Sequence, residues 1–126
     1  DLGHAPRQMI ERFAGTDLLA IESNYDPGMQ RRSRRPGFVK RRVMGERGHL
    51  SNREAFEAVR QIAIRSPRER PQHIVLLHRS RQCNDPQLVR KQFAQDPDIA
   101  GRIHLTEQRH CSCWFAIQPL RRRAQN

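Results

Sequence analysis

Two histidines occupy positions from which they could carry out chemistry together. His49 belongs to the Gly-His-Leu-Ser-Asn stretch of residues 48–52, just before an expected helix, and His78 ends the apolar run of residues 74–78. Functional side chains of α/β proteins gather where strands end and helices begin. A histidine at either place is also commonly a cap or a core residue. The pair predicts a shared metal or proton-transfer site, with a structural role as the alternative.

Two acidic residues occupy comparable positions. Glu22 ends the apolar run of residues 17–22, which is typical of a buried parallel strand, and Asp1 precedes a glycine-containing loop. One acid and two histidines could form a mononuclear site, but zinc usually takes at least three protein ligands. The sequence contains no His-x-His, His-Glu-x-x-His or Cys-x-x-Cys cluster. A metal bound here is therefore expected to take further ligands from outside this sequence.

The elements that must position these residues follow from the apolar periodicity. Buried strands are predicted at residues 17–22 and 73–77, and an earlier strand is predicted to end at Asp1. Helices are predicted at residues 6–13, from residue 51 or 52 to 65 with a capping box at 51–54, and from 85–86 to about 95. A short helix is expected from Asp26-Pro27, and two closing strands at residues 102–107 and 111–118 with a turn at 108–110. This order predicts an α/β fold with parallel crossovers.

The composition indicates one domain or part of one. The chain has 126 residues, 36% of them hydrophobic, and a mean hydropathy of -0.89, so much surface is expected or another segment must cover it. No apolar run reaches membrane-spanning length, which predicts no membrane association. An odd cysteine count with no disulfide-framework spacing favours a reduced, cytoplasmic protein.

The charge favours a polyanionic partner. The net charge is +11, and Lys40 and Lys91 are the only lysines among 24 basic residues. Arginine binds phosphate through paired hydrogen bonds, although a GC-rich genome also replaces lysine by arginine. The most basic segment, residues 30–47, is interrupted at Pro36-Gly37 and is either a solvated flexible connection or a lip that contacts phosphates. Nucleic acid is the predicted partner.

Five stretches taken together resemble one known family. They are residues 1–4 (Asp-Leu-Gly-His), 18–27 (Leu-Leu-Ala-Ile-Glu-Ser-Asn-Tyr-Asp-Pro), 48–52 (Gly-His-Leu-Ser-Asn), 76–80 (Leu-Leu-His-Arg-Ser) and 83–88 (Cys-Asn-Asp-Pro-Gln-Leu). In order and spacing they closely resemble the C-terminal half of metallo-β-lactamase-fold hydrolases, particularly the YycJ/WalJ-type subgroup, with tRNase Z as a more distant relative. The resemblance covers nearly the whole chain.

The resemblance implies the fold and the metal centre. Residues 1–126 would be the C-terminal portion of a single αββα sandwich with a mixed sheet and flanking helices. The N-terminal half, with the family's His-x-His-x-Asp-His motif, is absent from this sequence. The complete domain would hold two divalent metal ions, zinc in preference to manganese, with Asp1 as the bridging acid and His78 as a ligand. This chain alone is not expected to bind both ions fully.

The resemblance also implies the activity of the complete domain. Glu22 and His49 would form a proton-donating pair in a phosphodiesterase or nuclease acting on DNA or RNA. A metal-bound hydroxide would attack, and His49 would protonate the leaving oxygen. Substrate contacts are expected from Asn24, Asn52 and Arg42, and for the two asparagines a supporting role behind the ligands is the alternative.

Two other functions remain open from the sequence. The chain could be an inactive, truncated relative that binds nucleic acid or a ribonucleoprotein through its arginines. It could also come from a hydrolase of small phosphoesters or other esters, because this fold serves many chemistries. Whether the chain alone has enzymatic activity stays open, whereas the complete domain is expected to be an enzyme.

Overall fold

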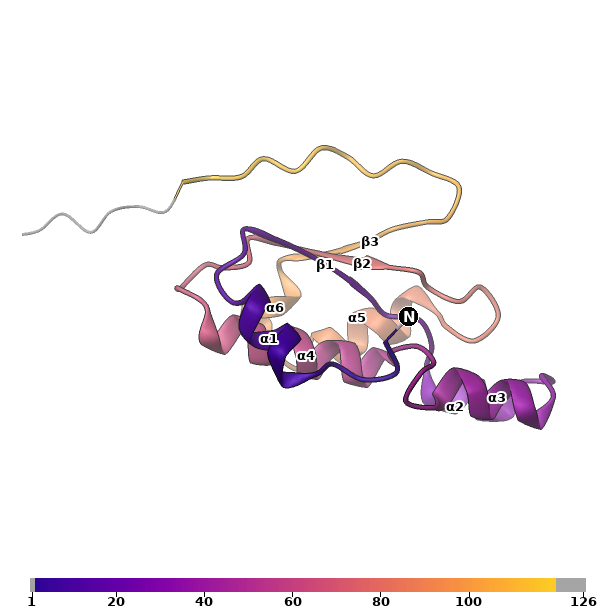
Figure 1. Cartoon of the computed structure of the whole chain (residues 1–126). Helices are drawn as coiled ribbons and strands as arrows, with labels where there is room; N and C mark the ends of the chain where they lie inside the picture. The colour runs from indigo at the N-terminus through magenta and orange to yellow at the C-terminus, as the bar shows by residue number, and fades with distance from the viewer. Residues whose placement is uncertain (1, 120–126) are drawn as a thin grey trace, which may run out of the picture.

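The computed structural model describes residues 2–119, which form a parallel sheet with helices packed on one face (Figure 1). The strands, in the order β1-β2-β3, are β1 (Leu18–Glu22), β2 (His73–Leu77) and β3 (Ile103–Leu105). The helices are α1 (Arg7–Phe13), α2 (Pro27–Arg32), α3 (Gly37–Met44), α4 (Asn52–Arg65), α5 (Pro86–Phe93) and α6 (Pro97–Ala100).

The predicted α/β fold with parallel crossovers is confirmed. Both strand pairs are parallel, so the described sheet is wholly parallel where a mixed sheet was expected. The short α6 was not predicted; its N-cap is Asp96, whose side chain accepts a hydrogen bond from the Asp98 N–H. Asp1, and the strand expected to end there, lie outside the described residues.

The core lies between the sheet and the helices. Alternation along the strands turns Leu19, Ile21, Ile74 and Leu76 toward α4 and α5, where all four are buried. Helix α4 contributes a stripe of Phe56, Val59 and Ile62, with Ala63 partly buried beside it. The Ser51 side chain accepts a hydrogen bond from the Glu54 N–H, and Glu54 bonds back to the Ser51 N–H. This predicted capping box fixes where α4 begins and places the N-cap, Ser51, two residues after His49.

The other face of the sheet is covered in part by an extended segment, which shows that the predicted strand at residues 111–118 is wrong. These residues form no strand ladder; they run back across the sheet after a turn that the Glu107–His110 bridge closes (Figure 1). Their backbone is held instead by side chains of β2 and of the segment just before it. His73 Nε2 lies 3.0 Å from the Ala116 carbonyl oxygen, and Arg70 donates to the Gln118 carbonyl at 2.8 Å. We call residues 111–118 the strap.

The strap rests on two histidines of this face. The Phe115 ring lies 5.2 Å from that of His73 and 4.7 Å from that of His104, centroid to centroid. Near the carboxyl ends of the strands the face is less covered, and Leu77 keeps 37% of its surface exposed. The strap is therefore a segment that lies on the sheet rather than a strand in its ladder.

The stability of the protein is expected to depend on pH through His104, on which the strap rests. Burial and the neighbouring His73 lower the pKa of His104 from its ordinary value of 6.5. The unfolded chain therefore binds more protons near this pH, and stability is lost as the pH falls through about 6.5. His104→Phe keeps a ring against Phe115 but cannot titrate, so its melting temperature should fall less than that of the wild type between about pH 7.5 and about pH 5.5. Equal decreases in the two proteins would refute this role.

The basic segment is helical rather than a flexible connection. Pro36 stands at the N-cap of α3 and separates it from α2, which confirms that residues 30–47 do not form one helix. Both helices lie beyond the carboxyl ends of β1 and β2 (Figure 1). They therefore flank the sheet edge at which functional side chains are expected.

Two further expectations concern cysteines and membranes. Cys83, Cys111 and Cys113 are all free thiols, as the spacing predicted. Within residues 2–119, no helix combines the length and the apolar character needed to cross a membrane.

Candidate metal and catalytic site

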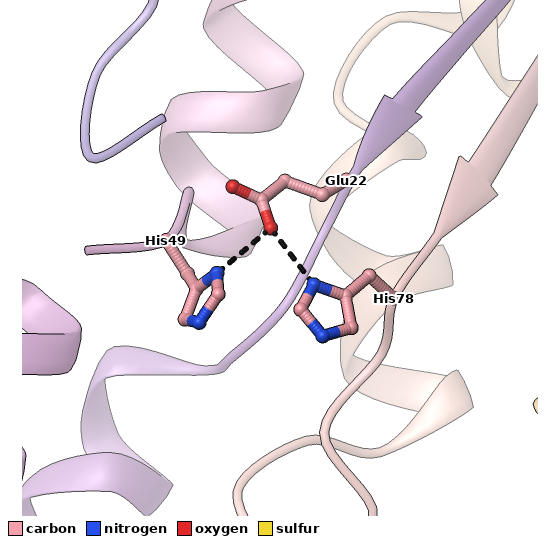
Figure 2. A group of neighbouring side chains, drawn as sticks. All are labelled: Glu22, His49 and His78. Carbon is pink, nitrogen blue, oxygen red and sulfur yellow. Dashed lines mark hydrogen bonds and ion pairs between the residues drawn. The ribbon is translucent and has the colours of Figure 1, made fainter. Parts of the chain in front are cut away.

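Glu22, His49 and His78 meet at the carboxyl edge of the sheet (Figure 2). Glu22 ends β1 in register with Leu77, so His78, the next residue after β2, lies beside it. His49 reaches the same place from the segment before α4. The Glu22 Oε2 atom lies 3.0 Å from His49 Nδ1 and 3.2 Å from His78 Nδ1, and the imidazole centroids are 4.8 Å apart. The structure thus brings together three of the residues singled out in the sequence.

The position of His49 is set by a close backbone contact at Gly48. The His49 N–H donates to the Val43 carbonyl at 2.9 Å, which joins this segment to the end of α3. A Cβ atom at position 48 would collide with the carbonyl oxygens of Val43 and Arg42. Glycine is therefore required before His49. On the other side, fully buried Leu50 donates its N–H to Glu22 Oε1 at 3.1 Å.

His78 is held in a backbone conformation that non-glycine residues rarely adopt. Its φ angle is 54°, in the left-handed region. The Asn24 side chain donates to the His78 carbonyl at 2.7 Å, and the Asn24 carbonyl accepts the Ser80 N–H at 2.8 Å. Asn24 thus clamps the turn after β2. Such strain persists where neighbouring contacts fix it, which is a feature of functional sites.

Glu22 is ionised and orients both imidazoles. Burial alone would raise the pKa of Glu22, but hydrogen bonds from the Leu50 N–H, His78, the Leu2 N–H and His49 outweigh it and lower the pKa from its ordinary value of 4.5. A carboxylate only accepts hydrogen bonds, so Nδ1 of each histidine carries the donated proton. Both Nε2 atoms lie on the side away from Glu22 (Figure 2).

This arrangement suits metal binding. Metal-ligating histidines commonly donate their second N–H to a carboxylate, which fixes the tautomer and leaves the other nitrogen as the ligand. Ligand atoms of Glu22, His49 and His78 all lie within 4.8 Å of one another, so the group could hold a metal ion. Asp1, the expected bridging acid, lies outside the described residues. Its neighbour Leu2 donates its N–H to Glu22 Oε1 at 3.4 Å.

Asn52 lies behind the site in a buried polar network. It exchanges two 2.8 Å hydrogen bonds with Asn84, and its Oδ1 also accepts from the Ser23 hydroxyl at 2.7 Å. Only 2% of Asn52 and 7% of Asn84 are exposed. This position fits the supporting role that the sequence left open for Asn52. Asn84 was identified only as part of the family-like stretch 83–88 and was given no role of its own.

Asn84→Ala is expected to destabilise the protein. It would leave Asn52 Nδ2 and the Ser23 carbonyl without their Asn84 partner. A buried polar group left unsatisfied costs about 1–3 kcal/mol. Urea unfolding measures the loss, and Gln87→Ala, at an exposed position of α5, is the matched control. An Asn84→Ala protein as stable as this control would show that the network contributes nothing.

A pocket of about 340 Å³ opens beside the histidines, and we call it the reaction pocket. His49 and His78 line it together with Asn24, Arg35, Val43, Ser80, Arg81, Gln82 and Gln108. Arg35 is held there because its guanidinium donates to Gln82 Oε1 at 3.2 and 3.3 Å. Arg42 lies exposed on α3. The sequence did not single out Arg35 within its basic segment and missed Arg81, although Arg81 follows His78 by only three residues.

The chain is similar in sequence to a named bacterial protein. The chain is 30% identical over 95 residues to the protein named Exodeoxyribonuclease YycJ from Bacillus anthracis. The alignment covers 75% of this chain and 34% of that protein, so the chain spans about a third of the relative's length. Searches with protein-family models and against solved structures gave no match. The similarity supports a distant relation of this chain to the YycJ family, whose fold is of the metallo-β-lactamase type.

Proposed function

We propose that this chain is the C-terminal portion of a metal-dependent phosphodiesterase, a nuclease that acts on DNA or RNA. The observation that carries this proposal is the Glu22 carboxylate between two imidazoles, beside a pocket lined by Arg35 and Arg81. Histidines supply metal ligation and proton transfer, and arginines bind phosphate oxygens. The relation to a protein named as an exodeoxyribonuclease supports the same class of reaction.

The residues present fit part of a dinuclear metal centre. His78 would ligate through Nε2 and Asp1 would bridge two divalent ions, zinc in preference to manganese. When bound, these ions supply charge neutralisation and a nucleophile at neutral pH. The other ligands would come from the N-terminal half of the same sandwich domain. Three observations favour such a half. Within residues 2–119 the possible ligand group comprises only Glu22, His49 and His78, the relative is longer than this chain, and apolar Leu18 and Leu77 are each 37% exposed on the sheet.

The chain's own residues supply proton donation, phosphate binding and positioning. His49 donates a proton from Nε2 to the leaving oxygen of the phosphodiester, and Glu22 orients its ring and stabilises the imidazolium. Arg35 and Arg81 neutralise the phosphate, and Asn24 holds the turn that carries His78. Arg42 contacts the nucleic-acid backbone from α3, and Asn52 acts through the buried network behind the site.

A second candidate is nucleic-acid binding without hydrolysis, which the net charge of +11 and the incomplete ligand set favour. The two functions differ in turnover. A chain carrying its upstream coding segment should hydrolyse a labelled oligonucleotide in the presence of Zn²⁺ or Mn²⁺ and stop when chelator is added. Salt-sensitive binding with no turnover would support the second candidate instead. Faster hydrolysis of a small phosphoester than of the oligonucleotide would contradict the nuclease assignment.

A further inference from the structure

A second pocket, of about 390 Å³, adjoins the reaction pocket at the same edge of the sheet. It is bounded by the turns after β2 and β3 and shares four residues with the reaction pocket, namely His78, Ser80, Arg81 and Gln108. We propose that the second pocket binds the nucleotide next to the reacting phosphate in a single nucleic-acid strand. This inference rests on the proposed function, which it extends from the site of reaction to the path of the substrate.

The charge of the second pocket fits a phosphodiester backbone. Arg79, Arg81 and Arg109 line it. The Oε2 atom of the lining acid, Glu107, lies 3.1 Å from His110 Nδ1. Within residues 2–119, the guanidinium groups of Arg81 and Arg109 make no hydrogen bond or ion pair, so they are available to an anionic ligand. Arginines in this state bind phosphate oxygens through paired N–H groups.

The frame of the second pocket is fixed by hydrogen bonds between its two turns. Arg79 donates to the Thr106 carbonyl at 3.3 Å, and the Thr106 hydroxyl donates to the Leu76 carbonyl at 3.0 Å. The Gln108 side chain donates to the Arg79 carbonyl at 3.5 Å. These bonds join the turn after β3 to the end of β2. Arg81 and Arg109 therefore project from turns that are tied to the sheet and to each other.

The size and the lining favour a single strand over a duplex. The two pockets, of about 340 and 390 Å³, fall in the size range of small-molecule sites, which suits separate nucleotide units. In a duplex the bases are stacked and paired and cannot enter such pockets without being extruded. The His110 ring and the arginine planes offer surfaces on which an unpaired base can stack.

The test compares two double variants that remove the same charge. Arg81→Gln/Arg109→Gln removes the two available arginines of the second pocket. Arg12→Gln/Arg68→Gln removes two exposed arginines at the opposite, amino end of the strands. Binding of oligo(dT) and oligo(rU) of about ten nucleotides, and of a duplex of the same length, is followed by fluorescence anisotropy without metal at several salt concentrations. Thermal melting checks that each variant is folded.

The expected result is about tenfold or greater loss of single-strand affinity in the pocket variant and little change in the control. The logarithm of the binding constant falls linearly with the logarithm of the salt concentration, by about 0.7 per phosphate contact on a single strand. Loss of two contacts should therefore make this slope shallower by about 1.4. Equal affinities of the two variants, or a duplex that binds as tightly as the single strand, would overturn the proposal. Comparison of oligo(dT) with oligo(rU) shows which sugar the pocket prefers. Because binding is measured without turnover, failure of hydrolysis would count against the proposed function and not against this pocket.

Discussion

Replacement of His78 by alanine is expected to lower phosphodiester hydrolysis by the complete domain about a thousandfold or more. Loss of a partner behind a ligand already costs about 10–100-fold, and loss of the ligand itself should cost more. Asp1→Ala should have a similar effect, because the proposed function assigns its carboxylate to both ions. The measurements are turnover of a labelled oligonucleotide and the bound metal per protein.

Two matched variants make the His78 result specific. Alanine could disturb the left-handed backbone at position 78, where φ is 54°, whereas asparagine tolerates this conformation. His78→Asn should therefore fold normally and still lose activity and metal. His4→Ala removes an exposed histidine that the proposal does not place in the site, and it should retain both. Full turnover in Asp1→Ala or His78→Asn would refute the metal site.

His49→Gln is expected to produce a smaller loss that depends on the leaving group. General acid catalysis contributes about 10²–10⁴-fold, and His49 supplies it only where the leaving oxygen needs a proton. The loss should be large for an oligonucleotide and small for a p-nitrophenyl phosphodiester, whose leaving group departs without protonation. Steady-state kinetics on both substrates measures the difference.

The metal bound by each variant distinguishes the role of His49 from that of His78. His49→Gln should bind metal as the wild type does, because its imidazole is assigned to proton transfer. Glu22→Gln should show the same leaving-group dependence, since Glu22 Oε2 orients His49 at 3.0 Å. An equal loss on both substrates would contradict proton donation, and loss of metal would make His49 a ligand instead.

Much of the fold could be predicted where one residue pattern has one structural solution. The apolar runs ending at Glu22 and Leu77 are too short and too continuous for anything but buried strands, and both are observed. The capping box at Ser51 and Glu54 defined the start of α4. The strap was mispredicted because alternation suits both a strand and a segment lying on a surface. Its anchors, among them His73 and Ala116, are far apart in the sequence.

Several residues of the candidate site could be predicted from the sequence, but most of the contacts between them could not. Family resemblance paired Glu22 with His49, and the structure places them in contact; their catalytic roles remain predictions. The contact of His78 with the same Glu22 oxygen depends on the register between β1 and β2, which the sequence does not display. Arg35 and Arg81 were not identified because turns, rather than periodic elements, bring them to the reaction pocket.

In the function proposed for this chain, Glu22, His49 and His78 form half of a metal-dependent phosphodiesterase site. The most direct test measures bound metal and oligonucleotide hydrolysis for the 126-residue chain alone and for the same chain joined to its upstream coding segment. The predicted result is two divalent ions and chelator-sensitive hydrolysis in the joined protein, with incomplete metal binding and no hydrolysis by the chain alone. A joined protein that binds no metal, or a chain that hydrolyses the oligonucleotide fully by itself, would contradict the claim.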